Sequence, residues 1–130
     1  MWRLIAISTL LLISSTAEAK RLHPEAYYQN IWCAEKQGQT EYELNDLTRV
    51  DCLLPDKAVE FDFANKWAEC IGQALYYGIK TNRQPVCAII IEQPKDKRYI
   101  KRLKTVADKH NIEIEEITCQ PDCECGRIEE

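Results

Sequence analysis

Apolar and polar positions along the chain follow two periods, which together predict three helices and five strands. Apolar residues recur at helical spacing in three segments, at 24–37, 64–79 and 96–110. Short apolar or alternating runs bounded by turn residues predict strands at 41–44, 48–53, 57–63, 86–91 and 112–118. The apolar run at 86–91 is uninterrupted, which is typical of a central parallel strand covered on both faces. The predicted order is therefore αβββαβαβ, which indicates one α/β domain.

The first 19 residues have the pattern of an export signal. Arg3 precedes an apolar run at 4–13, and small residues follow up to Ala19. The run is shorter than the roughly 20 residues that span a bilayer, which favours export over a retained anchor. We therefore expect an exported, secreted protein. Its chain divides into a signal peptide at 1–19, a domain at 20–118 and a cysteine-bearing tail at 119–130.

Composition and charge exclude several classes of protein. Of the 130 residues, 45% are hydrophobic and 29% are charged, which excludes a disordered chain and a polytopic membrane protein. The serines at 8, 14 and 15 all precede the expected cleavage point, so the mature chain has no serine nucleophile. The four glycines are scattered and form no phosphate-binding loop. The net charge of −4 does not imply tight nonspecific binding of nucleic acid.

A pair of acidic residues is predicted to meet on the second hairpin. A turn at 55–56 places Asp51 opposite Glu60, and Arg49 opposite Asp62, on one face of the two strands. Opposed carboxylates repel each other unless a cation lies between them, and hard oxygen ligands suit Mg²⁺ or Mn²⁺. We therefore expect a metal site at Asp51 and Glu60, and an ion pair between Arg49 and Asp62. In a register shifted by one residue, the two acids would instead be solvated surface carboxylates.

A second polar line lies on the helix predicted at 64–79. Lys66, Gln73 and Tyr77 share one side of the helix, apart from its apolar stripe. Because the helix follows Glu60 by only a few residues, the Lys66 ammonium can reach back toward the carboxylates. Two carboxylates, a metal and a lysine suit phosphodiester hydrolysis. Alternatively, Lys66 is an ordinary first-turn residue, and Gln73 and Tyr77 satisfy each other between helix and sheet.

These motifs resemble the PD-(D/E)XK nuclease superfamily, in particular small exported bacterial members with a RecB-type Q-x-x-x-Y motif. The resemblance is carried by residues 49–52, 58–67 and 72–77. It implies a restriction-endonuclease-like fold, in which an αβββαβ core with an extra helix and strand forms a mixed sheet flanked by helices. It also implies that Asp51 and Glu60 are metal ligands and that Glu41 is an additional acidic member. Gln73 and Tyr77 would approach the metal site and the DNA backbone.

The sequence departs from the superfamily pattern at Asp62, where the E-x-K motif has a lysine. In some members this lysine has moved to the next helix, and Lys66 is placed to replace it. The expected activity is a nuclease that uses Mg²⁺ or Mn²⁺ to hydrolyse DNA. One alternative is an inactive domain of the same fold that serves as a binding or structural module in the periplasm. Another is an exported zinc or redox protein that uses the cysteines of the tail.

Seven cysteines beyond the signal predict disulfide bonds in an oxidising compartment, with one thiol left over. Since Asp51 faces the proposed site, alternation along the strand turns Cys52 to the opposite face. If the helices at 24–37 and 64–79 cover opposite faces of the sheet, Cys33 can meet Cys52 there. The three tail cysteines would pair among themselves or with Cys70 or Cys87.

The helix predicted at 96–110 carries a basic run together with the residue before it. Its members are Lys95, Lys97, Arg98, Lys101, Arg102 and Lys104. Such a run is usually a solvated helix face. Alternatively, it steers phosphate groups toward a site.

Overall fold

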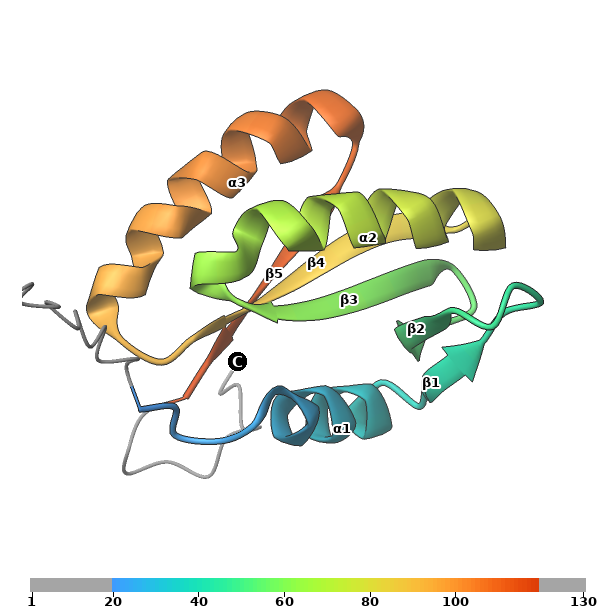
Figure 1. Cartoon of the computed structure of the whole chain (residues 1–130), viewed down its shortest axis with the longest axis horizontal. Coiled ribbons are helices and arrows are strands. Elements are labelled where there is room, and N and C mark those ends of the chain that lie inside the picture. The colour runs from blue at the N-terminus through green and yellow to red at the C-terminus, as the bar shows by residue number, and fades with distance from the viewer. Residues whose placement is uncertain (1–19, 120–130) are drawn as a thin grey trace, which may run out of the picture.

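All the predicted helices and strands are present in the computed structural model, which describes residues 20–119 (Figure 1). They are α1 (Glu25–Glu35), β1 (Gln39–Glu43), β2 (Arg49–Leu53), β3 (Lys57–Phe63), α2 (Trp67–Thr81), β4 (Gln84–Ile91), α3 (Lys97–His110) and β5 (Glu113–Thr118). Two 3₁₀ turns, η1 (Ala64–Lys66) and η2 (Pro94–Asp96), precede α2 and α3. The signal peptide expected at 1–19 and the tail cysteines at 123 and 125 lie outside the described residues.

The five strands form one sheet in the order β1-β2-β3-β4-β5. β2 runs antiparallel to both of its neighbours, whereas β3, β4 and β5 run parallel to one another. α2 and α3 cover one face and α1 covers the other, so the fold has three layers (Figure 1). The prediction of an α/β fold with a mixed sheet flanked by helices is therefore confirmed, as is the parallel, buried position of β4.

Apolar side chains fill both faces of the sheet because strand residues alternate between them. On one face, Trp32 of α1 packs against Val59 and Phe61 of β3. On the other face, Ala74 of α2 and Leu103 of α3 pack over the buried residues of β4. Odd-numbered residues of β3 thus face α1, and even-numbered residues face the side of α2.

The ends of the helices follow local sequence signals. Asn82 and Asn111 follow α2 and α3 in the left-handed conformation, with φ values of 51° and 52°. The start of α2 differs from the prediction, because a 3₁₀ turn occupies 64–66 and the α-helix begins at Trp67. Such turns are common at helix N-termini, and this one places Lys66 before the first turn of α2. No helix within 20–119 is long and apolar enough to cross a membrane.

Cys33 and Cys52 form the predicted disulfide, with their Cα atoms 5.8 Å apart. The prediction is confirmed because α1 and α2 do lie on opposite faces of the sheet, as it required (Figure 1). Cys70 and Cys87 are free thiols buried in the core. They are therefore not partners of the tail cysteines, and that alternative is wrong.

Candidate functional site

Three acidic residues lie in a row across the first three strands. The register of β2 and β3 puts Asp51 opposite Glu60, as predicted. Glu41 lies in β1 between the pairs Thr40–Cys52 and Tyr42–Val50, at the level of Asp51, although it does not itself pair with β2. Glu41 has a φ of 53° within its strand, a conformation that costs a non-glycine residue about 1–3 kcal/mol and often occurs at functional sites. The backbone of β1 is thus strained at Glu41. We call Glu41, Asp51 and Glu60 the acidic row.

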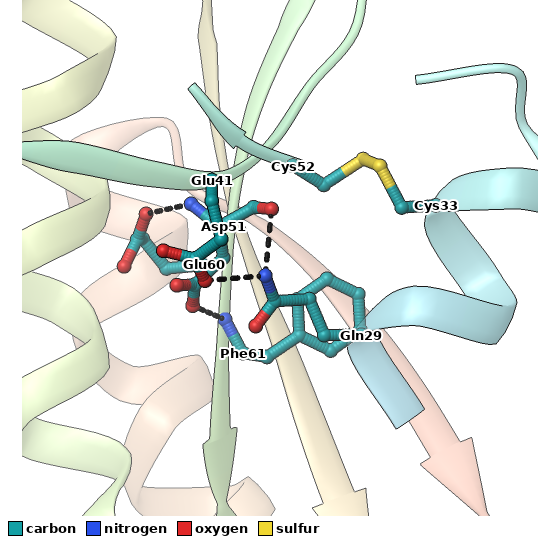
Figure 2. Close-up of a disulfide and its surroundings, with 7 residues drawn as sticks. All are labelled: Gln29, Cys33, Glu41, Asp51, Cys52, Glu60 and Phe61. Atoms are coloured by element: carbon teal, nitrogen blue, oxygen red, sulfur yellow. Dashed lines mark hydrogen bonds between the residues drawn. A yellow bond between two sulfur atoms is a disulfide. The ribbon is translucent and has the colours of Figure 1, made fainter. Parts of the chain in front are cut away.

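The carboxylates of Asp51 and Glu60 take the place of main-chain pairing at this end of the hairpin (Figure 2). The Asp51 N–H donates to Glu60 Oε1 at 3.1 Å, and the Phe61 N–H donates to Asp51 Oδ2 at 2.8 Å. Each acid therefore binds the main chain of the opposite strand. These two hydrogen bonds hold the carboxyl groups side by side.

Burial and mutual repulsion raise the pKa values of this pair. Glu60 is only 2% exposed. Its burial, followed by the charge of Asp51, raises the pKa of Glu60 well above its usual range. Burial, followed by the charge of Glu41, raises the pKa of Asp51. Because close carboxylates cannot both ionise without cost, the pair retains a proton near neutral pH, and a cation between them would remove the repulsion.

Asp62 adds a fourth carboxylate, on the same side of β3 as Glu60. It is 5% exposed, and its Oδ2 atom has no hydrogen-bond partner among the described residues. Burial, followed by the charge of Glu25, raises the pKa of Asp62 to about 7, and Lys66 opposes this shift. Lys66 also opposes the rise that burial and Asp51 cause in the pKa of Glu25. The ammonium of Lys66 therefore lies within electrostatic reach of the acids around Asp62.

The predicted ion pair between Arg49 and Asp62 is wrong. Arg49 Nη2 lies 3.1 Å from Glu43 Oε2, and Glu43 is its direct partner on the edge strand β1. Both side chains of this pair are about half exposed, so the guanidinium keeps much of its hydration. Contact with the buried Asp62 would require that hydration to be lost.

The two residues of the Q-x-x-x-Y motif lie in different surroundings. Tyr77 is 8% exposed and packs against Val50 and Ala58. Burial, followed by the charge of Glu60, raises the pKa of the Tyr77 hydroxyl. Gln73 lies one turn earlier on α2 and is exposed. The structure thus places Tyr77 near the acidic row, whereas Gln73 is accessible to a molecule outside it.

A buried glutamine that the sequence analysis did not identify connects α1 to the row. Gln29 is 3% exposed, and its Nε2 donates to Glu41 Oε1 at 2.8 Å and to the Asp51 carbonyl oxygen at 2.9 Å (Figure 2). One turn later, Cys33 ties the same helix to the residue that follows Asp51. The available signal was a polar residue on the buried face of the helix, four positions before Cys33.

The acids suit a hard divalent cation, although they do not form a complete cage for one. Within residues 20–119, no group of three His, Cys, Asp or Glu side chains could hold a metal ion. Mg²⁺ is usually held by one or two carboxylates, and waters and substrate phosphates complete its shell. Asp51 and Glu60 fit that requirement because their repulsion disfavours the state without a cation.

The fold and the acidic row define an α/β protein with closely paired carboxylates on adjacent antiparallel strands. No protein-family model matches the chain, and no curated protein or solved structure shows significant similarity to it.

Proposed function

We propose that this protein is an exported nuclease that uses Mg²⁺ or Mn²⁺ to hydrolyse phosphodiester bonds of DNA. The observation that carries the proposal is the Asp51–Glu60 pair, in which two carboxyl groups on adjacent strands are held together despite their repulsion. Such an arrangement costs stability unless a cation relieves it. A divalent cation bound there activates water and screens the charge of the phosphate.

The residues of the chain have distinct roles in this proposal. Asp51 and Glu60 hold the cation, and Glu41 keeps the row negative. Lys66 orients the attacking water or neutralises charge on the phosphate. Tyr77 and the exposed Gln73 contact the DNA backbone.

Export is the second part of the proposal. The Cys33–Cys52 disulfide supports it, because such bonds persist in oxidising compartments and are rare in the cytosol. A periplasmic or secreted location would also explain the signal-like pattern of residues 1–19.

A second candidate function is a catalytically inactive domain that serves as a binding or structural module in the same location. The observation that favours it is Asp62, which occupies the lysine position of the motif and is itself buried, with no partner for Oδ2 among residues 20–119. Unless Lys66 supplies the missing ammonium, the site lacks a cation that could orient the nucleophile.

Cleavage of DNA by the oxidised protein tests the proposal. Plasmid and single-stranded DNA should be degraded with Mg²⁺ or Mn²⁺ and left intact with a chelator. Asp51→Asn and Glu60→Gln should each abolish cleavage with an unchanged circular dichroism spectrum, and the exposed control Glu116→Gln should cleave like the wild type. If the oxidised wild-type protein cleaves neither DNA nor RNA with either metal, the nuclease proposal is overturned and the inactive module remains.

The position of the lysine provides a second test. Lys66→Ala should lower the turnover rate by orders of magnitude and change metal affinity little, whereas Lys80→Ala at the far end of α2 should have no effect. Adding Asp62→Lys to Lys66→Ala should restore part of the rate, because it returns an ammonium to the strand position of the motif. A Lys66→Ala variant with full activity would show that Lys66 has no catalytic role.

A further inference from the structure

The exposed side of α3 carries a cluster of positive charge away from the acidic residues described above. α3 contains six lysines and arginines and one acidic residue, Asp108. All six basic side chains are exposed, at Lys97, Arg98, Lys101, Arg102, Lys104 and Lys109. We call these six residues the basic face. It is notable in a chain whose net charge is −4, because the remainder of the molecule must be correspondingly acidic.

No carboxylate within the described residues forms a salt bridge with the basic face. The four salt bridges found among residues 20–119 join other parts of the molecule, and none includes a residue of α3. Within the part of the chain that the structure describes, the charges of the face are therefore without a salt-bridge partner.

The arrangement of these charges is unfavourable for the helix itself. After the N-cap residue Asp96, the first turn of α3 contains Lys97 and Arg98 and no acidic residue, although the helix dipole favours negative charge there. Lys97 and Lys101 are four residues apart, as are Arg98 and Arg102, and like charges at this spacing repel each other. A face that costs helix stability in the free protein is expected to gain from a partner that supplies negative charge.

Two of the arginines are held in place by an aromatic ring. The guanidinium carbons of Arg98 and Arg102 lie 4.7 Å and 5.5 Å from the centre of the Tyr99 ring. Arg98 Nη2 also donates to the Tyr99 hydroxyl at 2.8 Å. Held guanidinium groups lose less entropy when they bind phosphate, and their planar shape matches two phosphate oxygens.

The position of the basic face favours nucleic acid over a membrane surface. The apolar stripe of α3 at Ile100, Leu103 and Ala107 is buried in the core, so the helix has no apolar face to insert into a bilayer. α3 lies beside α2 on the same side of the sheet and contacts η1, which carries Lys66 (Figure 1). The helix that carries the basic face is therefore in contact with the turn that carries the proposed catalytic lysine.

We propose that the basic face of α3 binds the phosphate backbone of DNA, without reading its sequence, and holds the substrate next to the acidic row. This inference rests on the proposed function for the identity of the substrate. The contacts are electrostatic, and each lysine bound to a phosphate releases counterions from the DNA.

Fluorescence anisotropy with labelled 20-nucleotide single-stranded and duplex DNA, in a chelating buffer that prevents cleavage, tests the inference. The variant Lys101→Gln/Lys104→Gln removes two charges from the basic face. The variant Lys36→Gln/Lys80→Gln removes two exposed charges elsewhere and is the matched control. We expect the first variant to bind about tenfold more weakly at moderate salt, with the slope of log K against log salt smaller by about two. The control should bind like the wild type.

The outcomes separate this inference from the proposed function. Binding that depends on the basic face, without cleavage in the presence of metal, would support the inference and overturn the nuclease proposal. Cleavage with equal DNA binding by both variants would overturn the inference alone. Binding of the wild-type protein to vesicles containing phosphatidylglycerol, with none to DNA, would also overturn it and identify a lipid surface instead.

Discussion

The carboxyl group of Asp62 is the side chain for which pH dependence is easiest to derive. In the unfolded chain it ionises near pH 4, whereas in the folded protein burial and the charge of Glu25 raise its pKa to about 7. Between these values the folded state binds a proton that the unfolded state has lost. This bound proton therefore favours the folded state at low pH. Its contribution to the free energy of unfolding is lost as the pH rises through about 7.

We expect the thermal midpoint of the metal-free protein to fall between pH 4 and pH 8, and Asp62→Asn to make this fall smaller. A shift from 3.8 to about 7 corresponds to at most about 4 kcal/mol in the free energy of unfolding. Calorimetry of the wild type, of Asp62→Asn and of the exposed control Asp108→Asn over this range measures the effect. Curves for wild type and Asp62→Asn that stay parallel would contradict the assigned shift.

Which residues of the site can be predicted depends on how local their interactions are. The contact of Asp51 with Glu60 follows from a tight turn and strand alternation, so the sequence is sufficient to predict it. Arg49 was assigned to the wrong acid because its ion-pair partner lies on β1. The register of β1 cannot be derived from the β2–β3 turn. Gln29 was missed because its partners lie on strands that are distant in the sequence.

At the scale of elements, Gly38 connects α1 to β1 and packs directly against the disulfide. A Cβ atom at this position would lie 2.6 Å from Cys52 Sγ and 2.7 Å from Cys33 Sγ. Both sulfurs are fixed by their bond and by the core around them, so neither can move aside easily. Glycine is therefore required where the chain passes between the helix and the sheet.

We expect Gly38→Ala to destabilise the oxidised protein by about 1–3 kcal/mol, as for overpacked cores in general. Urea denaturation measures this change. Gly72→Ala is the matched control, because a Cβ there meets nothing within 4 Å, and alanine in a helix is favoured over glycine by about 1 kcal/mol. An equal effect of the two substitutions would show that the space around the disulfide does not limit residue 38.

Most helices and strands were predictable because the segments with a regular apolar pattern are long and are bounded by clear turn residues. The start of α2 was placed three residues too early, since the sequence pattern does not distinguish a 3₁₀ turn from the first turn of an α-helix. The parallel direction of β4 was predicted from its uninterrupted apolar run. No direction was predicted for β5, which also runs parallel to β4.

At the scale of the whole molecule, the thiols of Cys70 and Cys87 lie between α2 and the sheet and have no measurable exposure. Burial, followed by interaction with Cys87, raises the pKa of the Cys70 thiol well above its usual value. The reactive thiolate is therefore scarce and shielded in the folded protein.

We expect both thiols to resist alkylation until the domain unfolds. Mass spectrometry of peptides containing Cys70 and Cys87, after treatment with iodoacetamide in increasing urea, should show modification that follows the unfolding transition. Cys33 and Cys52 are joined in a disulfide and cannot react with iodoacetamide, so the peptides that contain them serve as an unmodified internal reference. Modification of either thiol in the absence of urea, or recovery of the two linked to each other, would contradict the arrangement of the core.

The hydrogen bonds that join the acidic pair to the main chain have a consequence for spectroscopy. The amide protons of Asp51 and Phe61 each point at a carboxylate oxygen of the pair. Their nuclear magnetic resonance frequencies depend on the charge of that oxygen, which changes when a proton leaves or a cation arrives. Two ordinary backbone amides therefore serve as intrinsic probes, and titrating the unmodified protein while following these two cross-peaks would resolve both events.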